Sequence, residues 1–182
     1  MTFVLDASGS VARRFELAQE LTELVVMGLN FANDRTRVGV ITYQAGAQIE
    51  FPLSRYNTQL EVFNAIAFKQ DREVIGTNTA DAIAMGTDEM FTVIGGDRTG
   101  VDDVMIVMSD GRSNMNTART VAAAEAARNA GVRVMGVGIG VAMDMGEINA
   151  IASDPDVDNA FFMPEESDLQ ATANQILDQL CQ

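Results

Sequence analysis

Residues 3–14 read FVLDASGSVARR, and the order of residue types in this segment predicts a strand that runs into a helix. The apolar run ends at Asp6, and Asp6, Ser8 and Ser10 then place side-chain oxygens at alternate positions of the turn. Such residues often act as helix N-caps, where they accept hydrogen bonds from the first backbone amides. A second interpretation is that the three side chains converge on a bound cation.

Strand and helix patterns alternate along the rest of the chain. Short apolar runs predict strands at residues 2–6, 36–44, 47–53, 103–111, 132–140 and 160–164. Helical spacing of apolar residues predicts helices from Leu17 to Leu29 and at residues 57–69, 78–92, 117–131, about 145–153 and about 165–180.

These patterns define an α/β fold class. Most of the strands are apolar on both faces, which is typical of parallel strands covered by helices on both sides. The segments 36–44 and 47–53 are separated by a short Ala45-Gly46 turn and predict an antiparallel hairpin. We therefore expect a doubly wound, mostly parallel central sheet with one antiparallel edge strand and helices on both faces.

Composition excludes several classes of function. The 182 residues include 26 acidic and 12 basic ones, and a net charge of -14 disfavours nucleic acid and anionic lipid as partners. The chain has no histidine, which excludes a serine–histidine triad and histidine-ligated zinc. No apolar run reaches the ~18 residues of a membrane span, so we expect no membrane insertion.

The residues that follow the parallel strands are the candidates for a binding site. Ligands of open α/β sheets sit beyond the carboxyl ends of the strands, where the strand order reverses. Asp6, Ser8 and Ser10 follow the first strand, Asp110 follows the strand at 103–109, and Thr77 precedes a predicted helix. All offer oxygen, which indicates a hard divalent cation such as Mg²⁺. Each motif alone is also common in caps and turns.

The combination resembles a von Willebrand factor type A domain, the Rossmann-like fold shared with integrin inserted domains. The resemblance covers nearly the whole chain and includes the segments FVLDASGS, TRVGVITYQAGAQIEFPL, IGTNTADAI, VMIVMSDGRS and VRVMGVGIG. It implies a metal-ion-dependent adhesion site made of Asp6, Ser8, Ser10, Thr77 and Asp110. The serines and the threonine would touch Mg²⁺, or Mn²⁺ or Ca²⁺, and the aspartates would act largely through water.

The resemblance also implies an adhesive function. An acidic side chain of a partner would complete the shell of the cation, and the partner would be an extracellular matrix protein, with collagen as the leading candidate. The segment VAMDMGE at 141–147 lacks the extra helix of the collagen-binding integrin domains, so the pattern is closer to the matrix-protein members of the family. Residues expected on the rim of the contact surface are Arg112, Asn114, Met143 and Asp144.

The resemblance bears on domain organisation and location as well. We expect residues 1–182 to be a single domain of a larger multidomain protein that is secreted into the extracellular matrix. Cys181 is the only cysteine and cannot form an internal disulfide. In the matrix-protein members a cysteine at this position often pairs with one just before the first strand, so we expect a partner upstream of this chain.

Two other functions are weighed against adhesion. An acidic structural domain would bind matrix, mineral or Ca²⁺ through surface charge, for which clusters such as SDPDVDN at 153–159 provide the side chains. A Mg²⁺-dependent phosphoryl-transfer enzyme would use a strand-end aspartate as its nucleophile. The enzyme hypothesis is the weaker one, because Ser8 stands where a second aspartate is usual and no lysine lies near Asp110 in sequence. We therefore expect no catalytic activity.

Overall fold

A computed structural model describes residues 1–8, 12–67, 76–109, 113–115 and 117–181. These residues build one six-stranded sheet with the order β3-β2-β1-β4-β5-β6. The strands are β1 (Thr2–Asp6), β2 (Gly39–Tyr43), β3 (Ala47–Phe51), β4 (Val104–Ser109), β5 (Arg133–Ile139) and β6 (Ala160–Met163). All neighbouring strands are parallel except β2 and β3, which are antiparallel. The predicted sheet, with its antiparallel edge strand, is confirmed.

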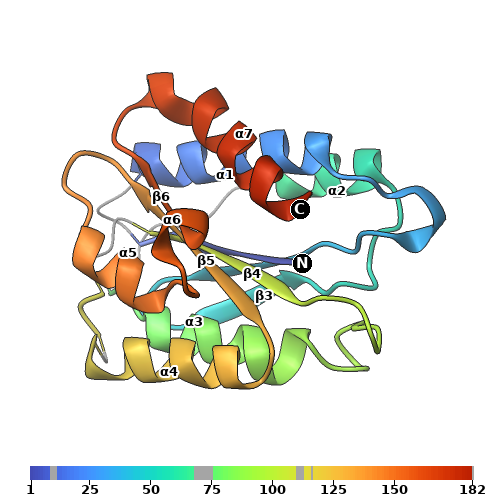
Figure 1. Cartoon of the computed structure of the whole chain (residues 1–182), viewed down its shortest axis with the longest axis horizontal. Helices are drawn as coiled ribbons and strands as arrows, with labels where there is room; N and C mark the ends of the chain where they lie inside the picture. Colours follow the sequence, from blue (N-terminus) through green and yellow to red (C-terminus); the bar gives the residue numbers. More distant parts are fainter. Residues whose placement is uncertain (9–11, 68–75, 110–112, 116, 182) are drawn as a thin grey trace.

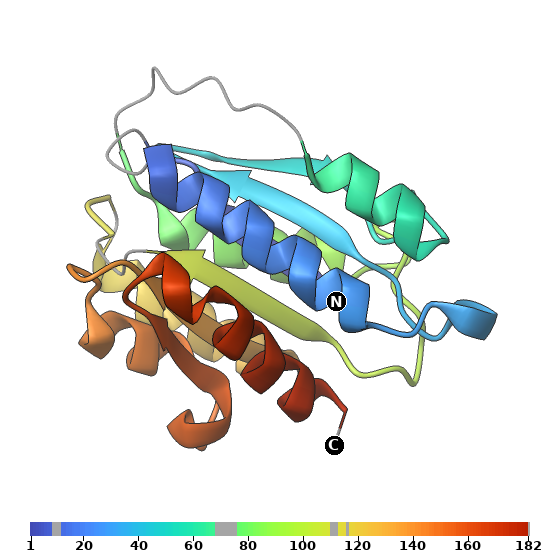
Figure 2. The ribbon, with the colours of Figure 1, turned by 90° about the horizontal axis from the view of Figure 1, so that it is seen from above.

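Helices cover both faces of the sheet (Figure 1). One face carries α1 (Ala12–Gly28), α2 (Gln59–Ile66) and α7 (Leu169–Leu180). The other face carries α3 (Thr79–Met85), α4 (Thr117–Asn129) and α5 (Met145–Ile151). From above, α1 and α7 lie side by side over the sheet, with α2 on the far side of α1 (Figure 2). The molecule therefore has the three layers of a doubly wound α/β fold.

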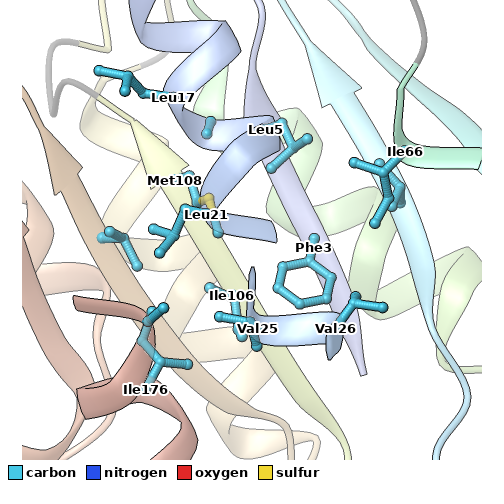
Figure 3. Packing of buried hydrophobic residues seen from close by; sticks show 14 of the residues in the cluster. Phe3, Leu5, Leu17, Leu21, Val25, Val26, Ile66, Ile106, Met108 and Ile176 are labelled. Carbon is cyan, nitrogen blue, oxygen red and sulfur yellow. The ribbon is translucent and has the colours of Figure 1, made fainter. Parts of the chain in front are cut away.

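The alternation of side chains in β1 explains why this strand lies in the middle of the sheet. Phe3 and Leu5 point to the face of α1, where they pack with Leu21 and Val25, and both are fully buried (Figure 3). Val4 points to the opposite face and joins the second buried cluster. Full burial of such a side chain stabilises the fold by about 1.5–3 kcal/mol, so a strand that is apolar on both faces is placed centrally.

Several element boundaries differ from the predicted ones. The strand expected at 36–44 spans only Gly39–Tyr43, because its parallel pairing with β1 covers these residues. The helix expected at 57–69 begins at Gln59, where Thr58 and Glu61 form a capping box. Its described part ends at Ile66.

The other differences lie near helix ends. The helix expected at 78–92 consists of α3 followed by a π-helical turn, η3 (Gly86–Met90). The last helix begins with a 3₁₀ turn, η4 (Glu166–Asp168), before α7. Two short helical turns, η2 (Ala32–Asp34) and α6 (Asp156–Asn159), were not predicted, because three or four residues are too few to establish helical periodicity.

The strand order places a topological switch point between β1 and β4. The chain proceeds from β1 outward to β2 and β3, then returns to the other side of β1 and continues outward through β4, β5 and β6. Connections on the two sides leave β1 and β4 in opposite directions, which opens a crevice at their carboxyl ends. Asp6 ends β1 at this crevice and Ser109 ends β4 beside it.

Candidate metal centre

Asp6 is a buried carboxylate held at both of its oxygens. The residue is 3% exposed. Its Oδ1 accepts a hydrogen bond from the backbone N–H of Ser8 at 3.0 Å, and its Oδ2 accepts one from the hydroxyl of Ser109 at 3.0 Å. The first bond closes a tight turn after β1 and the second joins the ends of β1 and β4. Asp6 therefore presents a negative charge in a fixed orientation at the switch point.

Ser8 carries a buried hydroxyl with an unused hydrogen-bonding capacity. The residue is 4% exposed, and its Oγ has no hydrogen-bond partner among the residues that the structure describes. Leaving such a group unpaired costs about 1–3 kcal/mol. A cation beside the hydroxyl would use its lone pairs.

The end of β2 joins the first two of the three loops of the site, which are the loop after β1, the loop before α3 and the loop after β4. The carbonyl of Tyr43 accepts a hydrogen bond from the backbone N–H of Ala7 at 2.8 Å. The next carbonyl, that of Gln44, accepts one from the backbone N–H of Asn78 at 2.7 Å. Ala7 lies between Asp6 and Ser8, and Asn78 follows Thr77. Two consecutive carbonyls at the end of β2 therefore hold the backbone beside these candidate ligands at one edge of the sheet.

Residues 113–115, which follow the third loop (the loop after β4), hold Thr77 by hydrogen bonds. Its backbone N–H donates to Asn114 Oδ1 at 2.9 Å. Its carbonyl accepts hydrogen bonds from the backbone amides of Asn114 and Met115, both at 3.1 Å, and from the Ser113 hydroxyl at 3.3 Å. The preceding Gly76 has φ +138°, a conformation that favours glycine. Thr77, itself 4% exposed, is thus fixed through its backbone.

The structure brings Asp6, Ser8 and Thr77 to the same edge of the sheet, as the strand-end argument predicts. Ser10, Asp110 and the rim candidate Arg112 lie outside the described residues. Ser109 and Ser113, which flank the third loop, contact Asp6 and Thr77 respectively. The described ends of the three loops therefore lie around the crevice. Asp6 offers carboxylate oxygen there and Ser8 and Thr77 are hydroxyl residues, which is the donor set preferred by Mg²⁺, Mn²⁺ and Ca²⁺.

The chain also matches the model of a known family. The family model of the von Willebrand factor type A domain (VWA) matches residues 1–175. The chain belongs to the VWA family. Mouse matrilin-1 is 31% identical over 184 aligned residues, which cover 100% of this chain and 35% of matrilin-1. The human collagen alpha-6(VI) chain is 29% identical over 185 residues, covering 100% of this chain and 8% of that relative.

Solved structures agree with the VWA fold. Proximal thread matrix protein 1 (PTMP1) from the mussel byssus superposes with a TM-score of 0.89 at 20% identity, covering 99% of this chain and 47% of that one. Another structure of PTMP1, described as having a zinc-occupied MIDAS motif, superposes with a TM-score of 0.87. The matrilin and collagen VI relatives are non-enzymatic, secreted proteins of the extracellular matrix, in agreement with the expected class and location. The VWA domain spans about a third of the length of matrilin-1.

Tyr43 lies beside the candidate metal site of the VWA domain and was not predicted from the sequence. Its hydroxyl is fully buried and donates to the Met108 carbonyl at 3.5 Å. Burial, followed by the negative charge of Asp6, raises the pKa of Tyr43 well above its ordinary value. The phenol is therefore neutral and supplies no charge to the site. A tyrosine within a buried strand offers no sequence signal of this role.

The expected rim residues of the VWA domain have structural contacts of their own. Asn114 is exposed but uses its side-chain oxygen to hold Thr77. Met143 is half-buried, and its sulfur lies 2.7 Å from the position that a Cβ on Gly138 would take. Asp144 is exposed and caps α5 by accepting a hydrogen bond from the Glu147 N–H at 3.1 Å.

The described part of the VWA domain contains no group of three or more histidine, cysteine, aspartate or glutamate side chains that could hold a metal ion. The candidate site differs from such a group because three of its five members are hydroxyl residues. Within the same residues, no helix is both long and apolar enough to cross a membrane.

Proposed function

We propose that this VWA domain is a non-catalytic adhesion module of the extracellular matrix that binds a protein ligand through a divalent cation. Asp6, Ser8, Ser10, Thr77 and Asp110 would hold the cation. Three loops that contribute no nitrogen or sulfur ligand suit a hard ion such as Mg²⁺, which keeps part of its water shell. An acidic side chain of the partner would replace one of these waters.

The observation that carries this proposal is the unpaired hydroxyl of Ser8. It lies beside the Asp6 carboxylate, where its Oγ is buried and lacks a hydrogen-bond partner among the described residues. Folding leaves such a group unsatisfied only at a cost, and a bound cation offsets that cost. The zinc-occupied MIDAS motif of PTMP1 supports the proposal that a domain of this fold holds a divalent ion.

Collagen is the first partner to test. Matrilin-1 and the collagen VI chain are matrix proteins related to this domain, so its ligand is expected in the same environment. The chain carries a net charge of -14, which repels an acidic partner at long range. A cation at the switch point would provide local positive charge for one acidic side chain. We therefore expect the partner to surround that acidic residue with neutral or basic ones.

Calorimetry with Mg²⁺, Mn²⁺ and Ca²⁺ tests the metal site directly. We expect Asp6→Asn and Asp110→Asn to weaken binding of the cation more than tenfold, because each removes a negative charge from the ligand set. Asp156→Asn is the matched control, since Asp156 is exposed in α6, which precedes β6 and lies at the opposite edge of the sheet. Absence of binding heat for all three ions would refute the proposal.

Immobilised collagens and other matrix proteins then test adhesion. Binding is expected in the presence of Mg²⁺ and lost in EDTA, and Asp6→Asn should abolish it while Asp156→Asn retains it. Hydrolysis of generic phosphate esters is expected to stay at background, in keeping with the non-enzymatic relatives. Turnover that disappears in Asp110→Asn would instead support the phosphoryl-transfer hypothesis.

Binding through surface charge is the second candidate function. Asp154 and Asp156 are exposed in an acidic segment, and the chain carries 26 acidic residues. Such a surface associates with basic matrix or Ca²⁺ through many weak contacts that salt screens. Collagen binding that survives EDTA but disappears at high salt would favour this mechanism over the metal site.

Cys181 provides a prediction about the longer protein. It is an exposed free cysteine just after α7. We propose that it pairs with a cysteine upstream of residue 1 in a secreted multidomain protein. Mass spectrometry of the non-reduced protein, extended upstream to include that cysteine, tests the pairing. Detection of Cys181 only as a free thiol in that protein would refute it.

A further inference from the structure

We propose that Ser109 and Asn114 are positioning residues that set the cation affinity by holding Asp6 and Thr77 in place before the ion binds. This inference rests on the proposed function, because it concerns the same site. Neither residue is among the proposed ligands. Ser109 was not singled out from the sequence, and Asn114 was expected on the rim that faces a partner.

Ser109 orients the carboxylate of Asp6. Leu5 pairs with Met108 in the parallel ladder of β1 and β4, so the next residues of both strands, Asp6 and Ser109, are neighbours. Ser109 is 3% exposed and its hydroxyl donates to Asp6 Oδ2 at 3.0 Å. Since Oδ1 already accepts the Ser8 amide, the second hydrogen bond prevents rotation of the carboxylate. An aspartate that acts on a cation through water depends on such a fixed direction.

Asn114 holds Thr77 through a reciprocal pair of hydrogen bonds. Its side-chain Oδ1 accepts the Thr77 N–H at 2.9 Å, and its backbone N–H donates to the Thr77 carbonyl at 3.1 Å. The two bonds fix both sides of Thr77 relative to the segment after the third loop. Because Thr77 is buried, loss of the Asn114 side chain would leave its amide without this partner. Although Asn114 is exposed, its side-chain oxygen therefore positions a residue of the site.

Hydrogen bonds that hold the ligands in place before the cation binds should raise the affinity for the cation. Binding to oxygens that are already in position costs little free energy for ordering the loops, whereas the loops of an unordered site must become ordered on binding. Removal of hydrogen-bond partners behind metal ligands typically weakens metal affinity 10–100-fold. Ser109 and Asn114 act on different loops, so each should contribute separately.

The experiment compares Ser109→Ala and Asn114→Ala with the control Ser153→Ala. The Ser153 hydroxyl accepts a hydrogen bond from the Val134 N–H at 2.9 Å, near the start of β5 and thus at the other edge of the sheet. Calorimetry measures the Kd for Mg²⁺, and thermal unfolding in EDTA measures the stability of the metal-free chain. We expect a 10–100-fold weaker Kd for the first two variants and an unchanged Kd for Ser153→Ala.

A conservative variant separates positioning from a general loss of structure. Asn114→Asp keeps an oxygen acceptor for the Thr77 amide and should bind Mg²⁺ more tightly than Asn114→Ala. Because Asn114 is exposed, this comparison decides the proposal even if Ser109→Ala fails to fold. Wild-type Kd values in both alanine variants would overturn this inference alone. A wild-type chain that binds no divalent cation would overturn the proposed function and this inference together.

Discussion

Replacing Ser8 by alanine should stabilise the metal-free domain and weaken its response to Mg²⁺. The Ser8 hydroxyl is buried and has no hydrogen-bond partner among the described residues. An unsatisfied buried polar group costs about 1–3 kcal/mol, and alanine removes the group with little change in volume. We expect Ser8→Ala to raise the free energy of unfolding in EDTA by about 1 kcal/mol, or the melting temperature by about 2–4 °C.

Addition of Mg²⁺ should reverse the order of stability. A ligand present at 100 times its Kd stabilises the folded state by about 2.7 kcal/mol. If loss of the Ser8 oxygen weakens the Kd tenfold, the same Mg²⁺ concentration stabilises the variant by only about 1.4 kcal/mol. The wild type therefore gains about 1.3 kcal/mol relative to Ser8→Ala, slightly more than the advantage of about 1 kcal/mol that the variant has in EDTA, so the order of stability reverses. A larger loss of affinity would widen the difference.

Thr2 provides a matched control for this prediction. Its hydroxyl is also buried without a partner in the described residues, but it lies at the opposite end of β1. Thr2→Val removes a similar unpaired hydroxyl with similar volume, so it should stabilise the domain in EDTA and retain the full response to Mg²⁺. Urea unfolding of the wild type and of both variants, each with EDTA and with Mg²⁺, gives the six values needed. Destabilisation by Ser8→Ala in EDTA, or a Mg²⁺ response equal to that of the wild type, would refute the reasoning.

Further predictions concern residues near the site and a helix end. Because the pKa of Tyr43 is raised in the folded state, the stability that its neutral phenol contributes is complete below about pH 10 and is lost at higher pH. The variant Tyr56→Phe leaves Tyr43 as the only tyrosine. Its ultraviolet titration should show no phenolate near pH ~10.5 until the chain unfolds. Arg128→Met removes a guanidinium that donates to the last carbonyls of α5 and should lower the free energy of unfolding in urea by about 1–2 kcal/mol, and an unchanged value would contradict this. Gly76→Ala places a side chain at φ +138° and should lower the free energy of unfolding by about 1–3 kcal/mol. It should also weaken the binding of Mg²⁺, because it displaces Thr77. Wild-type values in unfolding and in calorimetry would contradict this prediction.

The order of strands and helices was predictable because burial leaves a local record in the sequence. β1 is apolar at every position up to Asp6 except Thr2, and it is buried on both faces, as a central parallel strand requires. Boundaries were less predictable, since they depend on contacts with distant residues. β2 begins at Gly39 rather than Thr36 because Gly39 is the residue that pairs with Thr2 at the start of β1, far away in the sequence.

The sequence by itself determined which residues supply oxygen and at which strand ends they stand. It specified Asp6, Ser8 and Thr77 as candidate ligands, since residue types and their distance from an apolar run are local properties. Only the tertiary structure decided what holds these side chains in place. The hydrogen bond between Ser109 and Asp6 joins residues 103 positions apart, and the one between Thr77 and Asn114 joins residues 37 apart. No local pattern encodes such contacts, because they exist only once the parallel strands have placed their carboxyl ends side by side.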